Sequence, residues 1–125
     1  MINTLLVMGG GAVGAALRYH LGRLAGHMFG MGWPWGTLLA NIFGGLAMGV
    51  LVGYLARMAS GGEQVRLLLA VGGLGGFTTF SAFSLETVMM LERGETGPAL
   101  LYILVSVAGA IGALAFGLFA VRSLA

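Results

Sequence analysis

The chain contains four long apolar stretches, and this pattern constrains its fold more than any other feature. Crossing about 30 Å of hydrocarbon takes roughly 20 helical residues, and each stretch is long enough to do so. We place the spans at about 2–27, 33–56, 66–91 and 97–121. Because 58% of the residues are hydrophobic and 8% are charged, a soluble domain would lack the polar residues to cover its surface. The sequence predicts an all-α integral membrane protein with one four-span domain, residues 1–125.

Charge and cysteine content narrow the range of functions. All six cations are arginines, and they are scattered along the chain instead of forming the basic stripe of a nucleic-acid-binding protein. Cysteine is absent, which excludes disulfides and thiolate metal sites. No nucleophile stands beside a paired base, so the sequence does not favour an enzyme. We therefore expect membrane lipid, and no nucleic acid, among its partners.

The arginines are balanced between the two ends of the predicted bundle. A chain without a charge bias has no strong orientation preference, so both orientations are expected in one membrane. Since two-fold dimers are the commonest closed assembly, we predict an antiparallel, dual-topology homodimer. The two sets of arginines are Arg57, Arg66 and Arg122 on the side of the termini, and Arg18, Arg23 and Arg93 on the other side.

The glycines recur at helical spacing. Of the 24 glycines, Gly45, Gly49 and Gly53 recur every fourth residue, and Gly10 with Gly14 repeats that spacing. Small residues on one face allow helix backbones to approach closely in lipid, where apolar burial gives no gain. The pattern predicts close helix packing.

The third span carries the least helical sequence. Its glycine-rich segment 72–76 is followed by Phe77, Thr78 and Thr79, a poor composition for a helix interior. We predict a break near 75–79, with the threonines capping a second half-helix that begins near Phe80. Broken backbone at membrane depth is tolerated where it lines a cavity or coordinates an ion. A continuous helix with a glycine-lined groove is the alternative.

Few polar side chains lie inside the spans, and each is a candidate for function because burying it in lipid is costly. Asn41 lies in the middle of the second span and serves either a pathway or an interhelical contact, and Thr37 shares its face. Tyr102 and Ser106 share a face of the fourth span, where Tyr102 is either a pathway residue or an interfacial anchor. Glu86 lies toward the end of the third span, at a vestibule or at the surface.

Aromatic and cationic groups complete the candidate set. Phe80 and Phe83 are three residues apart, with Ser84 one turn after Phe80. Ring edges carry partial positive charge and can solvate a small anion weakly, although such a pair is also common in plain packing. Arg18 follows about 17 spanning residues, so its guanidinium should reach an interface or a wet vestibule.

Three segments resemble the signature segments of the Fluc (CrcB-type) fluoride channels, in the same order and at the same distances. They are GGAVGAALRY at 10–19, GTLLANIFGG at 36–45 and GGFTTFSAFS at 75–84. The resemblance covers essentially the whole chain. It departs from the family pattern at Ala82, where a threonine is usual, and near Ala110, where a polar residue is frequent.

The resemblance implies passive, fluoride-selective export through a dual-topology homodimer in the bacterial inner membrane, which gives fluoride resistance. It also implies a structural sodium ion (Na+) at the dimer axis, held by the backbone carbonyls of Gly75 and Thr78 from each copy. Neutral oxygens of this kind suit a hard cation. The fluoride pathway implied by position comprises Phe80, Phe83, Asn41, Ser84, Ser81, Thr37, Tyr102, Ser106 and Arg18.

One other class of membrane protein has the same size and number of spans. Small multidrug transporters are also four-span dimers with weak charge bias, but proton-coupled export of cations needs a carboxylate deep in a span. The first span has none, and Glu86 is placed toward an end of its span. The sequence therefore favours the channel over the transporter.

Overall fold

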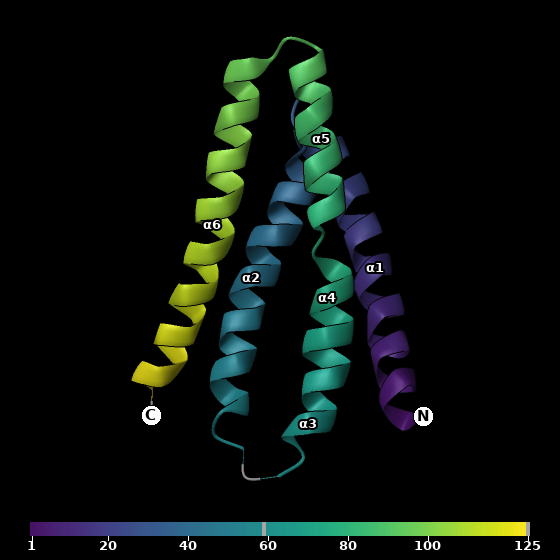
Figure 1. The fold of residues 1–125 in the computed structure, drawn as a ribbon, viewed down its shortest axis with the longest axis vertical. Helices are drawn as coiled ribbons and strands as arrows, with labels where there is room; N and C mark the ends of the chain where they lie inside the picture. The colour runs from purple at the N-terminus through teal and green to yellow at the C-terminus, as the bar shows by residue number, and fades with distance from the viewer. Residues whose placement is uncertain (59, 125) are drawn as a thin grey trace.

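The structure is a computed structural model that describes residues 1–58 and 60–124, and the regular elements within these ranges are helical. They form four rods, with both ends of the chain at the same end of the bundle (Figure 1). The first, second and fourth rods are α1 (Ile2–Phe29), α2 (Trp35–Leu55) and α6 (Thr96–Ser123). The third rod consists of α3 (Gly62–Val65), η1 (Arg66–Leu74), α4 (Gly75–Phe77) and α5 (Phe80–Glu92).

Three of these rods are long and apolar enough to cross a membrane, namely Trp35–Leu55, Gly62–Glu92 and Thr96–Ser123. The predicted multi-pass membrane character is thus confirmed. α1 has 28 residues, more than the roughly 20 that a crossing needs. Its glycines, arginines and histidines lower its hydropathy, and it is not among the three. The crossing by α1 stays a prediction.

The third rod breaks at Thr78 and Thr79, as the sequence predicts. Both residues are extended, with ψ of 159° and 123°, so the helical hydrogen bonding stops after α4 and resumes in α5. Thr79 is the N-cap of α5, and its side-chain oxygen accepts a hydrogen bond from the Ala82 amide at 3.1 Å. The break therefore divides the third span into two half-helices.

The first half of the third rod differs from the prediction in one respect. η1 is a π-helix of nine residues, and no feature of the sequence indicated it. It packs along α1 in a glycine-lined contact, where a Cβ atom added to Gly72 would lie 2.7 Å from the carbonyl oxygen of Val7. Since π-helical turns are usually short, this long π segment is unusual.

The predicted glycine faces are confirmed by the packing of α2 on α6. A Cβ atom added to Gly45 would lie 2.6 Å from the carbonyl oxygen of Ala110, and one added to Gly117 would lie 2.7 Å from that of Leu46. Both distances are shorter than any normal Cβ contact. The absence of side chains at these positions is what brings the two backbones together.

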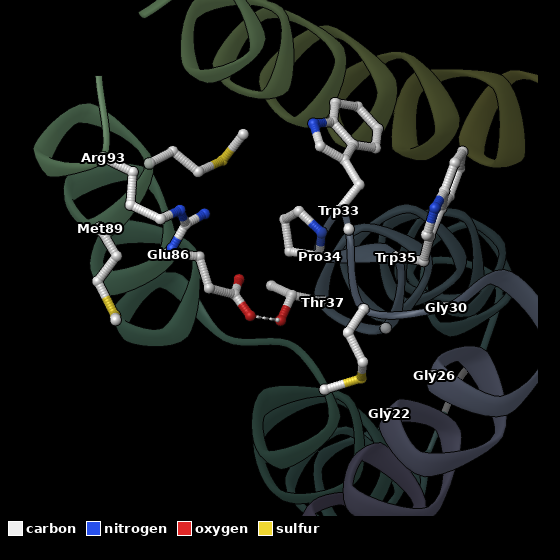
Figure 2. A pocket seen from close by; sticks show the side chains of 14 residues that line it. Gly22, Gly26, Gly30, Trp33, Pro34, Trp35, Thr37, Glu86, Met89 and Arg93 are labelled. Atoms are coloured by element: carbon white, nitrogen blue, oxygen red, sulfur yellow. Dashed lines mark hydrogen bonds between the residues drawn. The ribbon is translucent and has the colours of Figure 1, made fainter. Parts of the chain in front are cut away.

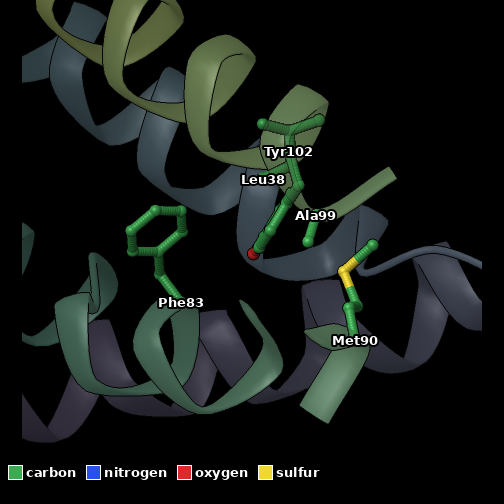
Figure 3. Close-up of a cluster of buried hydrophobic side chains, with 5 residues drawn as sticks. All are labelled: Leu38, Phe83, Met90, Ala99 and Tyr102. Carbon is green, nitrogen blue, oxygen red and sulfur yellow. The ribbon is translucent and has the colours of Figure 1, made fainter. Parts of the chain in front are cut away.

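The interior of the single chain is small. Leu38, Phe83, Met90, Ala99 and Tyr102 form a buried cluster contributed by α2, α5 and α6 (Figure 3). Most other large apolar side chains are exposed, as expected where lipid or another copy of the chain provides the surroundings. The cluster lies on the loop side of the break, meaning the side of the α1–α2 and α5–α6 connections, opposite the chain termini. It fixes α5 against the other two helices.

Candidate functional site

The break is held by an amide side chain from the neighbouring helix. Asn41 on α2 donates from Nδ2 to the carbonyl oxygen of Thr79 at 2.9 Å, and its Oδ1 accepts from the Thr79 backbone N–H at 2.7 Å. One side chain thus satisfies both polar backbone groups of a residue that belongs to neither half-helix. Asn41 makes the interhelical contact that the sequence left open, and it also borders the cavity described below.

Two of the backbone carbonyls that lose their helical donors at the break are those of Gly75 and Thr78. In a continuous helix the Thr79 amide would donate to the Gly75 carbonyl, and the Ala82 amide would donate to the Thr78 carbonyl. Here the Thr79 amide donates to Asn41, and the Ala82 amide donates to the Thr79 hydroxyl. The carbonyl oxygens of Gly75 and Thr78 are therefore among the groups that the break releases from helical bonding.

Arg18 contacts the same region from α1. Its Nε donates to the carbonyl oxygen of Gly76 at 3.3 Å, next to the released Gly75 carbonyl. The guanidinium also borders a cavity of about 640 Å³ together with Arg23 and Glu86. The structure thus places Arg18 between the break and a cavity.

Phenylalanine and tyrosine rings form a row beside the break. The ring centroids of Phe80 and Phe83 are 5.5 Å apart, and those of Phe83 and Tyr102 are 5.2 Å apart. Phe83 and Tyr102 are buried, whereas Phe80 is 78% exposed in the single chain. Such tilted arrangements direct ring edges, which are partly positive, toward neighbouring groups.

One cavity brings together four of the nine predicted pathway residues. It has a volume of about 430 Å³ and is bordered by α2, the break and α6. Ser106 borders it and is only 5% exposed, yet its hydroxyl has no hydrogen-bond partner within residues 1–58 and 60–124. A buried hydroxyl without a partner is costly, so this hydroxyl is available as a donor to a group that enters the cavity. The predicted pathway residues on this cavity are Asn41, Phe80, Phe83 and Ser106, and Thr78, predicted for the sodium site, also borders it.

The two serines of α5 are less available than the sequence suggested. The Ser84 hydroxyl donates to the carbonyl oxygen of Phe80 at 2.9 Å. The Ser81 hydroxyl lies 3.3 Å from that of Thr79, so these two side chains share a hydrogen bond. Neither serine borders the 430 Å³ cavity.

Glu86 is the site residue that sequence reasoning undervalued. Its Oε2 accepts from the Thr37 hydroxyl at 2.9 Å, shown by the dashed line in Figure 2, and its Oε1 accepts from the Tyr102 hydroxyl at 2.8 Å. The carboxylate therefore connects α5 with α2 and α6. It borders a cavity of about 290 Å³ lined by Trp33, Trp35 and other residues of the α1–α2 connection (Figure 2). The available signal was that Glu86 is the only carboxylate within a predicted span, although it lies toward the end of that span.

Comparison with known proteins places the chain in a family. Residues 5–118 match the family described as CrcB-like protein, camphor resistance (CrcB). The chain belongs to the CrcB-like family. Relatives named fluoride-specific ion channel FluC include one from Chelativorans sp. (strain BNC1), which is 52% identical over 124 residues and 99% of each chain.

Other CrcB-like relatives are similar over a comparable length. One from Sphingopyxis alaskensis is 52% identical over 124 residues, with 98% of each chain covered. One from Novosphingobium aromaticivorans is 51% identical over 127 residues, with 100% of each chain covered. Both are also named fluoride-specific ion channel FluC. The resemblance drawn from the three sequence segments is thus confirmed at the level of the family.

Proposed function

We propose that this CrcB-like chain forms a fluoride-selective channel that passes fluoride down its electrochemical gradient. The observation that carries the proposal is the cavity beside the broken third span, where an unpartnered buried hydroxyl, ring edges and an amide surround one space. The names of relatives about half identical over the whole chain support the same ion. Export of this kind from the bacterial inner membrane gives resistance to fluoride.

The first half of the mechanism is the replacement of water around a small anion. α5 begins at the break, so its first backbone N–H groups and the positive end of its dipole lie at mid-span. Ser106 adds a hydroxyl donor, and the edges of Phe80 and Phe83 add weak positive charge. These donors are fixed in place by the fold, so they substitute for the hydration shell without reorganising.

The second half is the access route to that cavity. Arg18 and Thr37 border the 640 Å³ cavity on the loop side of the break, and an arginine there attracts anions. Tyr102 lies between Glu86 and Phe83. Its hydroxyl donates a hydrogen bond to Glu86, and its ring packs against that of Phe83. We assign Arg18 and Thr37 to the vestibule, Tyr102 to the passage, and Ser81 and Ser84 to the α5 face beside the rings.

A second copy of the chain completes the proposed pathway. Phe80 is 78% exposed, and Gly75 is also exposed, although both belong to the break in the middle of a span. An antiparallel partner would cover these groups, and the equal number of arginines at the two ends is compatible with insertion in both orientations. Labelling of a C-terminal tag from both sides of the membrane should find both orientations, and an exclusively cytoplasmic tag would contradict the antiparallel dimer.

The released carbonyls of Gly75 and Thr78 fit a structural sodium ion. They are neutral oxygens, which suit a hard cation, but a single chain supplies only two. Two copies related by a two-fold axis would supply four. The ion would contribute positive charge near the proposed anion path, and it would satisfy carbonyls that have lost their helical donors.

Reconstituted protein tests the channel directly. Liposomes loaded with potassium fluoride and potassium chloride should release fluoride through the protein and retain chloride, as followed with ion-selective electrodes. Protein-free liposomes give the background. Equal release of both ions, or release of neither, contradicts the proposal. A small multidrug transporter, the alternative from the sequence, would instead export organic cations in exchange for protons, and the comparisons do not favour it.

A further inference from the structure

The arginines at the two ends of the bundle differ in their acidic partners. The end that carries the termini has three arginines and a single acidic side chain, Glu63. That carboxylate is already paired with Arg66 at 2.8 Å. At the opposite end, three carboxylates accompany three arginines, and Arg93 is paired with Glu95 at 3.0 Å. Arg57 and Arg122 are thus left without a carboxylate partner within the described ranges 1–58 and 60–124.

The fold brings Arg57 against the backbone of α6 next to Arg122. α2 and α6 run parallel to each other, so both C-termini lie at the end of the bundle that carries the chain termini (Figure 1). Arg57 follows α2 and donates from Nη2 to the carbonyl oxygen of Val121, the residue before Arg122. Both arginines are exposed. The guanidinium of Arg57 also lies 5.8 Å from the centroid of the Tyr54 ring, and tyrosine is typical of the membrane interface.

The local charge remains positive after the helix ends are considered. Each helix C-terminus carries about half a negative charge, so two C-termini offset about one of the two arginines. A guanidinium has five N–H donors, and the bond to Val121 uses one of those on Arg57. The remaining donors lie at the end of two membrane-spanning helices, which is the depth of lipid headgroups. The cluster is therefore matched to an anion located in the headgroup layer.

We infer that Arg57, Arg122 and Tyr54 form a binding site for the phosphate of an anionic phospholipid. The two guanidiniums donate to the phosphate oxygens, and the Tyr54 ring supports Arg57 at the interface. This site does not depend on the proposed channel function, since it lies at the far end of α2 and α6 from Glu86 and the loop-side cavities. Each arginine is expected to contribute about a five-fold increase in affinity for anionic lipid.

Thermal unfolding of the full-length purified protein in a neutral detergent tests the site. Short-chain phosphatidylglycerol should raise the unfolding temperature, whereas phosphatidylcholine of the same chain length should not. Inorganic phosphate at the same concentration and ionic strength should also have no effect, because it lacks the acyl chains that place the headgroup. An equal shift with inorganic phosphate would overturn the assignment to lipid, as would an equal shift with phosphatidylcholine.

Variants locate the binding. Arg57→Gln with Arg122→Gln should need roughly 25-fold more phosphatidylglycerol for a half-maximal shift. Arg122→Gln alone breaks no hydrogen bond within the described residues and should need about five-fold more, so it tests the site even if the double variant does not fold. The matched control, Arg23→Gln with Arg93→Gln, removes the same charge at the other end. An unchanged response in Arg122→Gln, or an equal loss in the control, would overturn the inference.

Discussion

Replacing Asn41 by leucine tests whether its amide holds the broken third span together. Leucine has a similar volume but cannot bond to the N–H and carbonyl of Thr79, which are 2.7 and 2.9 Å from the Asn41 side chain. Each buried backbone group left without a partner costs about 1–3 kcal/mol. As the N-cap of α5, Thr79 keeps the helical hydrogen bond to its carbonyl, so the main cost comes from its N–H. Because both residues are half-buried and border a cavity, we expect about 1–2 kcal/mol in total. Thermal unfolding of the purified protein should show a clear loss of stability. Wild-type stability would refute the conclusion that the Asn41 amide holds the break together.

Asn41→Asp separates the effect of a negative charge at this position from the effect of the hydrogen bonds between Asn41 and Thr79. Aspartate keeps the acceptor for the Thr79 amide and loses only the donor to the Thr79 carbonyl, which retains its bond within α5, so the smaller part of the stability cost should remain. Its charge also faces the 430 Å³ cavity. An anion about 5 Å away would be repelled by about 3 kcal/mol at an effective dielectric constant near 20, which corresponds to a roughly 200-fold slower flux. Fluoride release from liposomes measures this, and a wild-type rate in Asn41→Asp would show that anions do not pass near Asn41.

Three further substitutions test separate parts of the fold and the pathway. Phe80→Ile should nearly abolish fluoride flux while leaving the proposed dimer intact in size-exclusion chromatography, and normal flux would remove this ring from the mechanism. Thr79→Val deletes the N-cap of α5 and should lower stability by about 1 kcal/mol in thermal unfolding, and an unchanged unfolding temperature would mean that the cap contributes little. Gly45→Val should prevent α2 from packing on α6, because its Cβ would lie 2.6 Å from the Ala110 carbonyl oxygen, and little folded protein should be recovered. Gly112→Val is the control, since nothing lies within 4 Å of that position, and equal losses in both variants would contradict the packing argument.

Local sequence was sufficient to predict the break and the helix faces. The glycines before Thr78 weaken the helix, and a threonine side chain caps the next one, so both effects act within a few residues. The glycine spacing predicted the close approach of α2 and α6 for a similar reason, because residues four apart share a face whatever the helix packs against. The π-helical form of η1 left no such signal, and the composition of its residues does not explain it.

The contacts within the candidate site depend on residues far apart in the chain. Asn41 reaches Thr79 across 38 positions, and Thr37 reaches Glu86 across 49. The sequence identified Asn41 and Thr37 as candidates because polar groups are rare in spans, but it could not show which partners they meet. For the same reason Glu86 was placed at a vestibule or the surface, whereas the structure makes it the shared acceptor of hydroxyls from α2 and α6.

The hydrogen bonds around the break follow a division that explains how a broken helix is tolerated in a membrane. Groups that face the same chain are satisfied by it: Asn41 takes both backbone groups of Thr79, and Arg18 takes the Gly76 carbonyl. Polar groups that border the cavity, or that are exposed on the single chain, remain available to bind an ion. They are of two kinds, which attract ions of opposite charge. The carbonyls of Gly75 and Thr78 attract cations, whereas the Ser106 hydroxyl and the start of α5 attract anions. Because both kinds of group arise from one break, a cation held by the carbonyls would lower the energy of an anion at the neighbouring donors. We therefore expect the rate of fluoride release to rise with sodium concentration at constant ionic strength. A rate that does not change with sodium would mean that the carbonyls hold no ion.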